Sequence, residues 1–379
     1  MSYFSFELLH TSKKSGARVG RIHTPHGIID TPNFVAVGTN GTLKALDNVT
    51  VNSLGLQLMF CNTYHLMVHP GVDVIKEAGG LHTFIQRPHP IITDSGGFQV
   101  FSLAYGTVKE ELKSKGLNRH TEAVIKISEE GVLFRSYRDG SPLMLTPESS
   151  IQAQKALGAD IIIPFDELPP YHIDPKKLKE SLHRTHRWEE RSLIEHRKNP
   201  QQQAIYAVIH GGIDSELRTL SCQFLTQLPF DGFAIGGSVG KNRNEMIAML
   251  THTVPLLPTT APNHLLGIGD LPSVDLCVRL GIDTFDSSYP TRCARHGLLF
   301  MGDHTSSHLK IFQTRYRAVH EPIDRTCECY TCLNYTVSYL HHLFKAKEMA
   351  ACTLATIHNV HFMVSLMKKY QHAILQGAI

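Results

Sequence analysis

The sequence predicts an α/β fold of the (β/α)8 (TIM) barrel type, and three observations lead to this prediction. Eight short apolar runs, each ending in a small or polar residue, recur along the 379 residues of the chain. The runs are continuously apolar rather than alternating, which is typical of parallel strands buried on both faces. Helical patterns lie in several of the intervals, and eight strands that alternate with helices favour a closed barrel.

The expected elements follow in chain order. Residues 19–34 (VGRIHTPHGIIDTPNF) predict one or two hairpins that close the bottom of the barrel. Residues 106–143 are expected to form a large insertion before the fourth strand. The predicted helices include 148–158, 174–198 and 214–228. The eight predicted strands are FVAVGT (34–39), LMFCNT (58–63), IITDSGG (91–97), IIIPFDE (161–167), IYAVIHGG (205–212), GFAIGG (232–237), HLLGIGD (264–270) and TFDSS (284–288).

Composition and charge exclude several classes of protein. Hydrophobic residues make up 42% of the chain and charged residues 19%, which is the mix of a globular protein rather than a disordered one. The net charge of +3 gives no strong field over the whole molecule, so any nucleic-acid site must be local. No apolar run reaches the length of a membrane span, and the first residues lack the pattern of a secretion signal. We therefore expect a cytoplasmic protein without a membrane segment.

Polar residues and glycines gather where the predicted strands end. In a (β/α)8 barrel the C-terminal ends of all strands meet at one face, where these folds place their active sites. The alternative is that strand ends are polar merely because the strands stop there, which explains single residues better than the whole set. The sequence therefore predicts a site at this face, with the candidates Asn62, Asp94, Asp166, His210, Gly236, Gly267 and Asp286.

Three of the eight cysteines form a tight cluster, Cys327-x-Cys329-x-x-Cys332. Thiolates at this spacing suit a tetrahedral Zn²⁺ ion, which needs a fourth ligand from elsewhere. A site with four protein ligands leaves no position for substrate, so we expect structural zinc; the alternative is a redox or accidental cluster. So few cysteines in a long chain also favour a reducing compartment over a disulfide scaffold. Downstream candidates for the fourth ligand are His341, His342, Cys352, His358 and His361.

Several segments together resemble one known family. They are DSGGFQ (94–99), GVLFRSYRDGS (131–141), GADIIIPFDE (158–167), GGSVGK (236–241), LLGIGD (265–270), GIDTFDSSYPTR (281–292) and the cysteine cluster with His358. In these segments the chain resembles the tRNA-guanine transglycosylases, also called queuine tRNA-ribosyltransferases, most closely the bacterial type. The resemblance implies an irregular barrel with a C-terminal zinc-binding insertion, His358 as the fourth ligand, and a homodimer. We expect the barrel with its hairpin closure to span 1–310, and the zinc-binding subdomain with a C-terminal helix packed on the barrel to span 311–379.

The resemblance implies an enzyme that replaces guanine at the wobble position of GUN-anticodon tRNAs with queuine or a 7-deazaguanine precursor. A carboxylate can break the glycosidic bond without losing the RNA chain, because its attack on the anomeric carbon forms a covalent aspartyl-RNA ester. A second group must protonate the departing purine and deprotonate its replacement. By the resemblance the nucleophile is Asp286 and the acid/base is Asp94. Without the resemblance, the alternatives are a turn residue for Asp286 and a helix cap for Asp94, which Ser-Gly-Gly follows.

The resemblance also implies which residues bind the base and the RNA. A guanine edge presents two donors beside a carbonyl group; Asp166 matches the carboxylate that accepts from the donors, and the glycine backbone can meet the carbonyl. Phe98 and Leu266 match the two side chains that sandwich the ring of the base. The expected substrate-binding residues are Asp94, Ser95, Gly96, Gly97, Phe98, Asp166, His210, Gly236, Gly237 and Leu266. The expected RNA-binding residues are Gly267, Ile268, Gly269, Asp270, Leu271, Pro272, Ser273, Thr291, Arg292, Cys293, Ala294 and Arg295.

Departures from the bacterial pattern concern the incoming base. The family usually has Gln where His210 stands, and its segment matching 236–241 is one residue longer with an acid where Lys241 stands. In the family, that acid supports recognition of an aminomethyl group. Lys241 stands in its place here and would repel the cationic aminomethyl substituent, so we expect queuine to be used at least as well as 7-aminomethyl-7-deazaguanine. Leu168 stands where the bacterial enzymes usually carry a small Cys. The competing interpretation is that the shortened segment and Leu168 repack against each other and leave a pocket of the usual bacterial size.

Two other functions are alternatives. A non-catalytic tRNA-binding subunit of a heterodimeric transglycosylase would be expected to lose Asp94 or Asp286, and both are present. An ordinary barrel glycosidase would use the same two carboxylates, but it would not be expected to carry DSGGFQ together with a zinc site.

Overall fold

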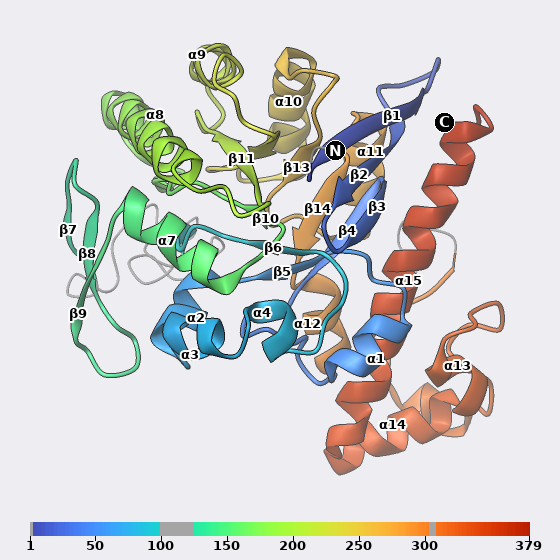
Figure 1. Cartoon of the computed structure of the whole chain (residues 1–379). Coiled ribbons are helices and arrows are strands. Elements are labelled where there is room, and N and C mark those ends of the chain that lie inside the picture. Colours follow the sequence, from blue (N-terminus) through green and yellow to red (C-terminus); the bar gives the residue numbers. More distant parts are fainter. Residues whose placement is uncertain (1–2, 99–123, 303–307) are drawn as a thin grey trace.

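Eight parallel strands close into a barrel in the computed structural model, which describes residues 3–98, 124–302 and 308–379 (Figure 1). The closed order confirms the predicted fold, and each of the eight apolar runs supplies one strand. Alternate strand residues belong to two separate apolar clusters, one inside the barrel and one beneath the helices, which explains why the runs are apolar throughout. In order around the barrel the strands are β4 (Asn33–Val37), β5 (Met59–Cys61), β6 (Ile91–Thr93), β10 (Ile161–Ile162), β11 (Ala204–Ile209), β12 (Gly232–Ile235), β13 (Asn263–Leu265) and β14 (Thr284–Ser287).

The N-terminal segment forms a three-stranded antiparallel sheet of two hairpins, β1 (Ser5–Thr11), β2 (Arg18–Thr24) and β3 (Gly27–Thr31). Its buried residues Ile22 and Ile29 belong to the same apolar cluster as Val35 of β4 and Tyr206 of β11. The sheet therefore packs onto the interior of the barrel and removes its apolar residues from water.

Helices surround the barrel, and the three helices expected from the sequence are present within a few residues of their predicted ends. They are α7 (Pro147–Leu157), α8 (Pro175–Arg197) and α9 (Ser215–Leu225), which begin after the capping side chains of Thr146, Asp174 and Asp214. The other helices that the structure describes up to residue 295 are α1 (Asn48–Ser53), α2 (Thr63–Val68), α3 (Val72–Glu77), α4 (Leu81–Phe84), α10 (Arg243–Thr253) with the 3-10 turn Val254–Leu256, α11 (Leu271–Arg279) and α12 (Tyr289–Arg295).

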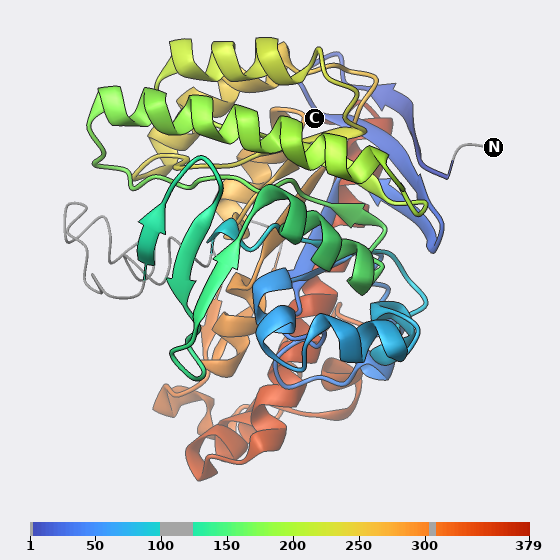
Figure 2. The same ribbon diagram turned by 60° about the vertical axis from the view of Figure 1, so that its left-hand side comes forward.

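The part of the predicted insertion that the structure describes is a second antiparallel sheet, β7 (Val124–Ile127), β8 (Val132–Arg135) and β9 (Pro142–Leu145). Residues 106–123 of that prediction lie outside the described residues. Figure 2 shows this sheet beside α7 and α8. Phe134 of β8 packs in a cluster with Tyr64 of α2 and Trp188 of α8, so the sheet is tied to the barrel helices.

The C-terminal part is helical and ends in the long helix α15 (Met349–Leu375). It also contains β15 (Leu298–Phe300), β16 (His308–Lys310), the 3-10 turn Thr314–Ala318, α13 (Tyr330–Asn334) and α14 (Val337–Ala346). Helix α15 contacts α12, β4 and β2 of the barrel part as well as α13 and α14, so it joins the two predicted regions. The boundary between residues 310 and 311 stays a prediction.

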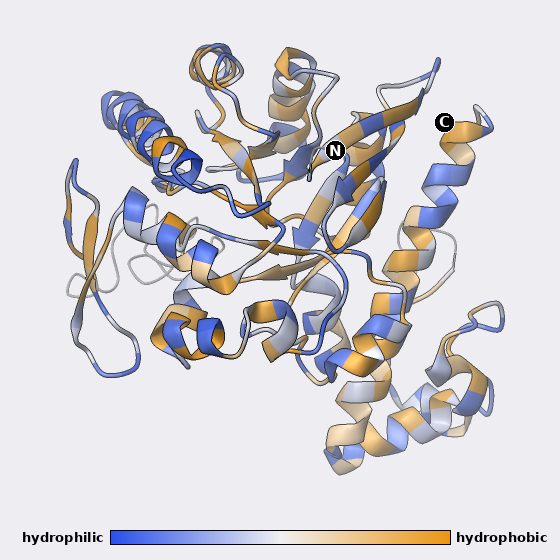
Figure 3. Ribbon diagram, viewed as in Figure 1, coloured by the Kyte–Doolittle hydropathy of each residue, from blue (hydrophilic) through white to orange (hydrophobic). Residues whose placement is uncertain are grey.

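Helix α15 is also long and apolar enough to cross a membrane by length and composition alone. Apolar and polar residues alternate along it in Figure 3, and 56% of its most apolar window is buried inside the protein. The core helix of a soluble protein passes the same test, so this feature is weak evidence for a membrane span.

Candidate active site

The residues expected at the strand ends lie at one end of the barrel. Because all eight strands are parallel, the segments that follow β6, β10, β11, β12 and β13 share that end with the last residues of β14. Hydrogen bonds between these segments join the candidates into three groups, around Asp286, Asp94 and Asp166.

Asp286 is held from the neighbouring strand. Its Oδ1 accepts a hydrogen bond from the backbone N–H of Gly267 (3.0 Å) and lies 3.1 Å from Nε2 of His264. His264 is fully buried in β13, and its Nδ1 lies 2.8 Å from Oγ1 of Thr284. Sequence reasoning did not single out His264. The available signal was its place one residue before Leu265, which puts a polar ring on the barrel-facing side of an apolar run.

Asp94 follows β6 and contacts the start of α2. Its Oδ1 accepts from the backbone N–H of Thr63 (2.7 Å) and its Oδ2 from the side-chain amide of Asn62 (2.6 Å). The capping interpretation therefore describes a real contact, although with α2 and not with the segment that follows Asp94. Both contacts fix the carboxylate without moving it from the strand-end face, so the chemical role expected for Asp94 is compatible with them.

Asp166 lies between two expected substrate-binding residues. Its Oδ1 accepts from the Ser95 hydroxyl (2.8 Å), and its Oδ2 lies 2.9 Å from Nε2 of His210. Gly97 lies directly against it, because a Cβ on Gly97 would come within 2.9 Å of Asp166 Oδ1. These contacts orient the Asp166 carboxylate while leaving each oxygen a second lone pair for a ligand.

The turn after β12 closes the other side of this group. Gly237 has φ +74°, and a Cβ there would lie 2.8 Å from Nδ1 of His210. A Cβ on Gly236 would lie 3.1 Å from Cδ1 of Leu266. Gly236, Gly237 and Leu266 are thus brought together with the Asp166 group, as expected. Phe98 is 46% exposed and is the last residue described before the gap at 99–123.

Arg218 of α9, which sequence reasoning missed, supports that turn from beneath. Its guanidinium is fully buried and donates to four backbone carbonyls, those of Ile209 (2.6 Å), Gly212 (2.8 Å), Gly236 (2.9 Å) and Ser238 (3.2 Å). Burial lowers the pKa of Arg218 to about 10, so the group stays charged at neutral pH. An arginine inside an amphipathic helix gives no sequence signal for this role.

Lys241 does not act as an unopposed charge. Its Nζ lies 3.0 Å from Oε1 of Glu245 and over the ring of Tyr171, whose hydroxyl donates to Oε2 of the same glutamate (3.0 Å). The hydrogen bond and the charge of Glu245 raise the pKa of Lys241. The argument that Lys241 alone repels a cationic substituent is therefore weakened, because a carboxylate from α10 accompanies it.

The two expected RNA-binding stretches divide by exposure. Gly267 and Arg292 are exposed, and Ile268, Asp270, Pro272 and Arg295 are partly exposed. Asp270 caps α11 and pairs with Arg243 (2.7 Å). The remaining residues of the stretches are buried: Gly269, Leu271, Ser273, Thr291, Cys293 and Ala294.

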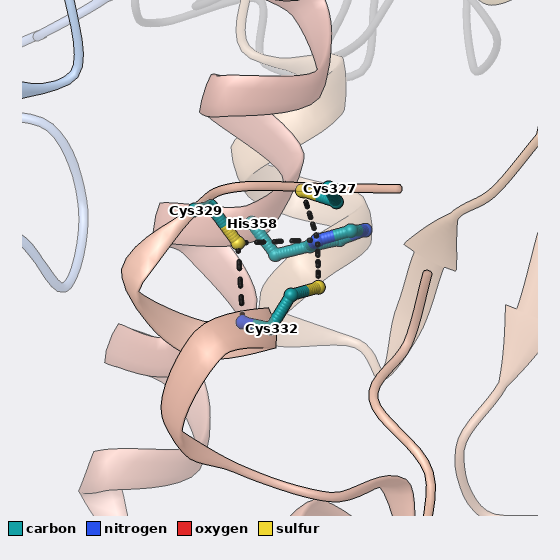
Figure 4. A group of neighbouring side chains, drawn as sticks. All are labelled: Cys327, Cys329, Cys332 and His358. Carbon is teal, nitrogen blue, oxygen red and sulfur yellow. Dashed lines mark hydrogen bonds between the residues drawn. The ribbon is translucent and has the colours of Figure 1, made fainter. Parts of the chain in front are cut away.

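Cys327, Cys329, Cys332 and His358 form a cluster that can hold a metal ion (Figure 4). The three sulfur atoms lie 3.7, 3.5 and 3.3 Å from Nδ1 of His358. Metal–ligand bonds of about 2.3 Å to sulfur and about 2.0 Å to nitrogen in a tetrahedral site place such atoms about 3.5 Å apart, so the donor set fits zinc. Nε2 of His358 lies 2.7 Å from the carbonyl oxygen of Phe300, the kind of contact that orients a ligating histidine. Another predicted candidate, His361, lies with its Nδ1 3.6 Å from Cys327 Sγ.

Comparison with known proteins decides the family. The family model described as queuine tRNA-ribosyltransferase matches residues 12–379. This chain belongs to that family. A queuine tRNA-ribosyltransferase of Protochlamydia amoebophila (strain UWE25) is 65% identical over 379 residues, covering 100% of this chain and 97% of the relative. Proteins of the same name from Chlamydia felis and Chlamydia trachomatis serovar L2 are 54% and 53% identical over 375 residues, with 99% of each chain covered.

Proposed function

We propose that this chain is a tRNA-guanine transglycosylase that replaces guanine at the wobble position of GUN-anticodon tRNAs with queuine or a 7-deazaguanine precursor. The observation that carries the proposal is the presence of Asp94, Asp166 and Asp286 at one end of the barrel, in a chain 65% identical to a queuine tRNA-ribosyltransferase. A non-catalytic tRNA-binding subunit is disfavoured because both carboxylates needed for chemistry are present and buried at this end.

In the proposed reaction, a carboxylate oxygen of Asp286 attacks the anomeric carbon of the target nucleotide. The bond to the departing guanine breaks, its electron pair goes to the base, and Asp94 supplies the proton. The resulting sugar ester preserves the RNA chain until the incoming base attacks the same carbon and gives its proton to Asp94. This attack displaces the Asp286 carboxylate, so two successive displacements retain the configuration at the sugar, as in retaining glycosidases.

Asp166 is the group proposed to recognise the base. Two donors of a guanine-like edge meet its two carboxylate oxygens, which Ser95 and His210 already orient at 2.8 and 2.9 Å. The backbone N–H groups of Gly236 and Gly237 are proposed to meet the base carbonyl, at a turn that Arg218 holds in place. The proposal places the ring between Phe98 and Leu266.

RNA binding is proposed to depend on the exposed members of the two stretches. Arg292 is exposed, and its guanidinium lies over the Tyr289 ring. Both residues belong to α12, the helix that follows the strand carrying Asp286. The charge of Arg292 suits a phosphate near the target nucleotide. Arg295 is partly exposed and is proposed to act beside it.

Zinc is the metal proposed for the cysteine cluster, with Cys327, Cys329, Cys332 and His358 as ligands. A closed site of this kind supplies structure and not chemistry, since it ties the cysteine loop to α15. Metal analysis should find about one zinc per chain. His358→Ala should lose the metal while His361→Ala keeps it, and the opposite result would reassign the fourth ligand.

The incoming base stays open between queuine and 7-aminomethyl-7-deazaguanine. The shortened turn with the small Ser238 favours queuine, because it leaves room for a bulkier substituent. The pairing of Lys241 with Glu245 weakens the argument that the charge of Lys241 repels the aminomethyl base. We retain queuine as the proposed base, used at least as well as the aminomethyl base. A higher kcat/KM for the aminomethyl base would contradict this, because that ratio measures differential transition-state binding. We also propose a homodimer located in the cytoplasm, by likeness to the family.

The deciding experiment is the exchange of labelled guanine out of a GUN tRNA. Asp286→Asn should abolish exchange and the denaturation-resistant RNA adduct while RNA binding persists, because the substitution keeps the shape and removes the nucleophile. Asp94→Asn should also fail to turn over. Near wild-type exchange by either variant would refute the roles given to these residues.

A further inference from the structure

His264 is a buried histidine that the proposed reaction does not yet use. It lies in β13 with no exposed surface, and β13 pairs with β14 so that His264 is opposite Thr284. Its Nε2 is 3.1 Å from Oδ1 of Asp286, and the ring of Phe60 stacks beside it at 6.1 Å. A polar ring in this position inside the barrel is costly to bury unless its nitrogens are satisfied.

The hydrogen-bond partners settle which way the Asp286 contact runs. An ionised carboxylate only accepts, so Nε2 of His264 must carry a proton that it donates to Oδ1. On the other side of the ring, Nδ1 faces the hydroxyl of Thr284 at 2.8 Å, and that hydroxyl also lies 3.3 Å from the carbonyl oxygen of Asn263. Thr284 can therefore donate to Nδ1 or accept from it, and in both cases Nε2 remains a donor to Asp286.

We propose that His264 is a positioning residue for the nucleophile, acting together with the backbone N–H of Gly267. This inference rests on the proposed function. Both donors contact the same oxygen, Oδ1, so they fix the carboxylate with Oδ2 presented to the anomeric carbon. In the ester, Oδ2 is bonded to the sugar and Oδ1 is the ester carbonyl.

The two donors affect the two displacements unequally. In the first displacement the carboxylate charge on Asp286 is consumed, so hydrogen bonds to Oδ1 weaken. In the second, the incoming base bonds to the anomeric carbon, the Oδ2–carbon bond breaks, and its electron pair returns to the carboxylate. Donors at Oδ1 stabilise the charge that develops there. His264 thus assists departure of the aspartate more than its attack.

The test compares the two half-reactions in the full-length enzyme. The rate at which the denaturation-resistant adduct forms is measured with a tRNA that carries guanosine at the wobble position; added guanine then gives the rate at which the adduct disappears. His264→Phe keeps the ring and removes the donor. It should slow disappearance of the adduct by about 10- to 100-fold, the effect of losing a hydrogen bond to a charged group, and slow its formation less, so that adduct accumulates.

Conservative variants separate positioning from folding. His264→Gln retains an amide donor and should recover much of the second rate, and Thr284→Val should give a smaller loss in the same direction. His196→Phe, which replaces a buried histidine of α8 away from the site, controls for damage to the core. If His264→Phe does not fold, the rates of the Gln and Val variants decide.

Equal slowing of both half-reactions by the His264 variants, or no slowing of adduct disappearance, would overturn this inference. That failure is distinct from failure of the proposed function. If Asp286→Asn still forms adduct, the nucleophile itself is wrong. If Asp286→Asn forms none while His264→Phe leaves the balance between the two rates unchanged, only the role of His264 is wrong.

Discussion

Replacing Arg218 with methionine should destabilise the protein and weaken base binding at the same time. The substitution keeps an unbranched apolar stem but removes a buried guanidinium that donates to four carbonyl oxygens at 2.6 to 3.2 Å. The Ile209 carbonyl keeps a second donor, the backbone N–H of Gly236 (3.1 Å). Loss of the donor costs about 1 kcal/mol or more at each of the other three acceptors, which sums to about 3 kcal/mol. Relief of the desolvated charge offsets part of this, so the free energy of unfolding should fall by about 2–3 kcal/mol.

Urea unfolding of the two proteins measures the first effect. The matched control is Arg279→Met, because Arg279 lies on the surface and pairs with Asp275 one helical turn away; the expected change there is about 0.5 kcal/mol or less. Exchange kinetics measure the second effect, and KM for the incoming base should rise because the Gly236–Ser238 turn loses its support. If Arg218→Met is no less stable than Arg279→Met, the four carbonyls do not depend on this side chain and the reasoning fails.

Three further perturbations test other contacts. Gly237→Ala places a Cβ 2.8 Å from Nδ1 of His210 on a backbone with φ +74°, so KM for the base should rise several-fold with little change in RNA affinity; an unchanged KM would remove this turn from the base site. Chelation of the metal should unfold the cysteine loop and weaken RNA binding before it affects the exchange step itself, as followed by circular dichroism and filter binding; loss of chemistry with RNA binding intact would count against a structural metal. A hydrogen bond to Asp160 raises the pKa of His26 above its unfolded value, so its stabilising effect should be complete below about pH 6.5 and fade as pH rises through the folded pKa; His26→Ala should flatten this part of the stability profile, and an unchanged profile would exclude the contact.

The sequence by itself determined the barrel and the places where function gathers. Strands buried on both faces must be apolar throughout, and the eight such runs gave all eight strands, even β10, which is only two residues long. Parallel strands must also end at a common face, so the sequence alone predicts that Asp94, Asp166 and Asp286 share it. The spacing of the three cysteines indicated a metal site because their ligand atoms are close along the chain.

Only the tertiary structure decided which side chains touch. His264 meets Asp286 because β13 and β14 pair in one register, and Arg218 reaches the turn after β12 because α9 packs beside it. The burial of residues such as Leu271 and Ala294 likewise depends on how helices lie on the closed barrel. Local patterns in a sequence report what a residue prefers to be near, namely water or apolar neighbours. Which partner it meets is fixed by barrel closure, which brings together residues far apart along the chain.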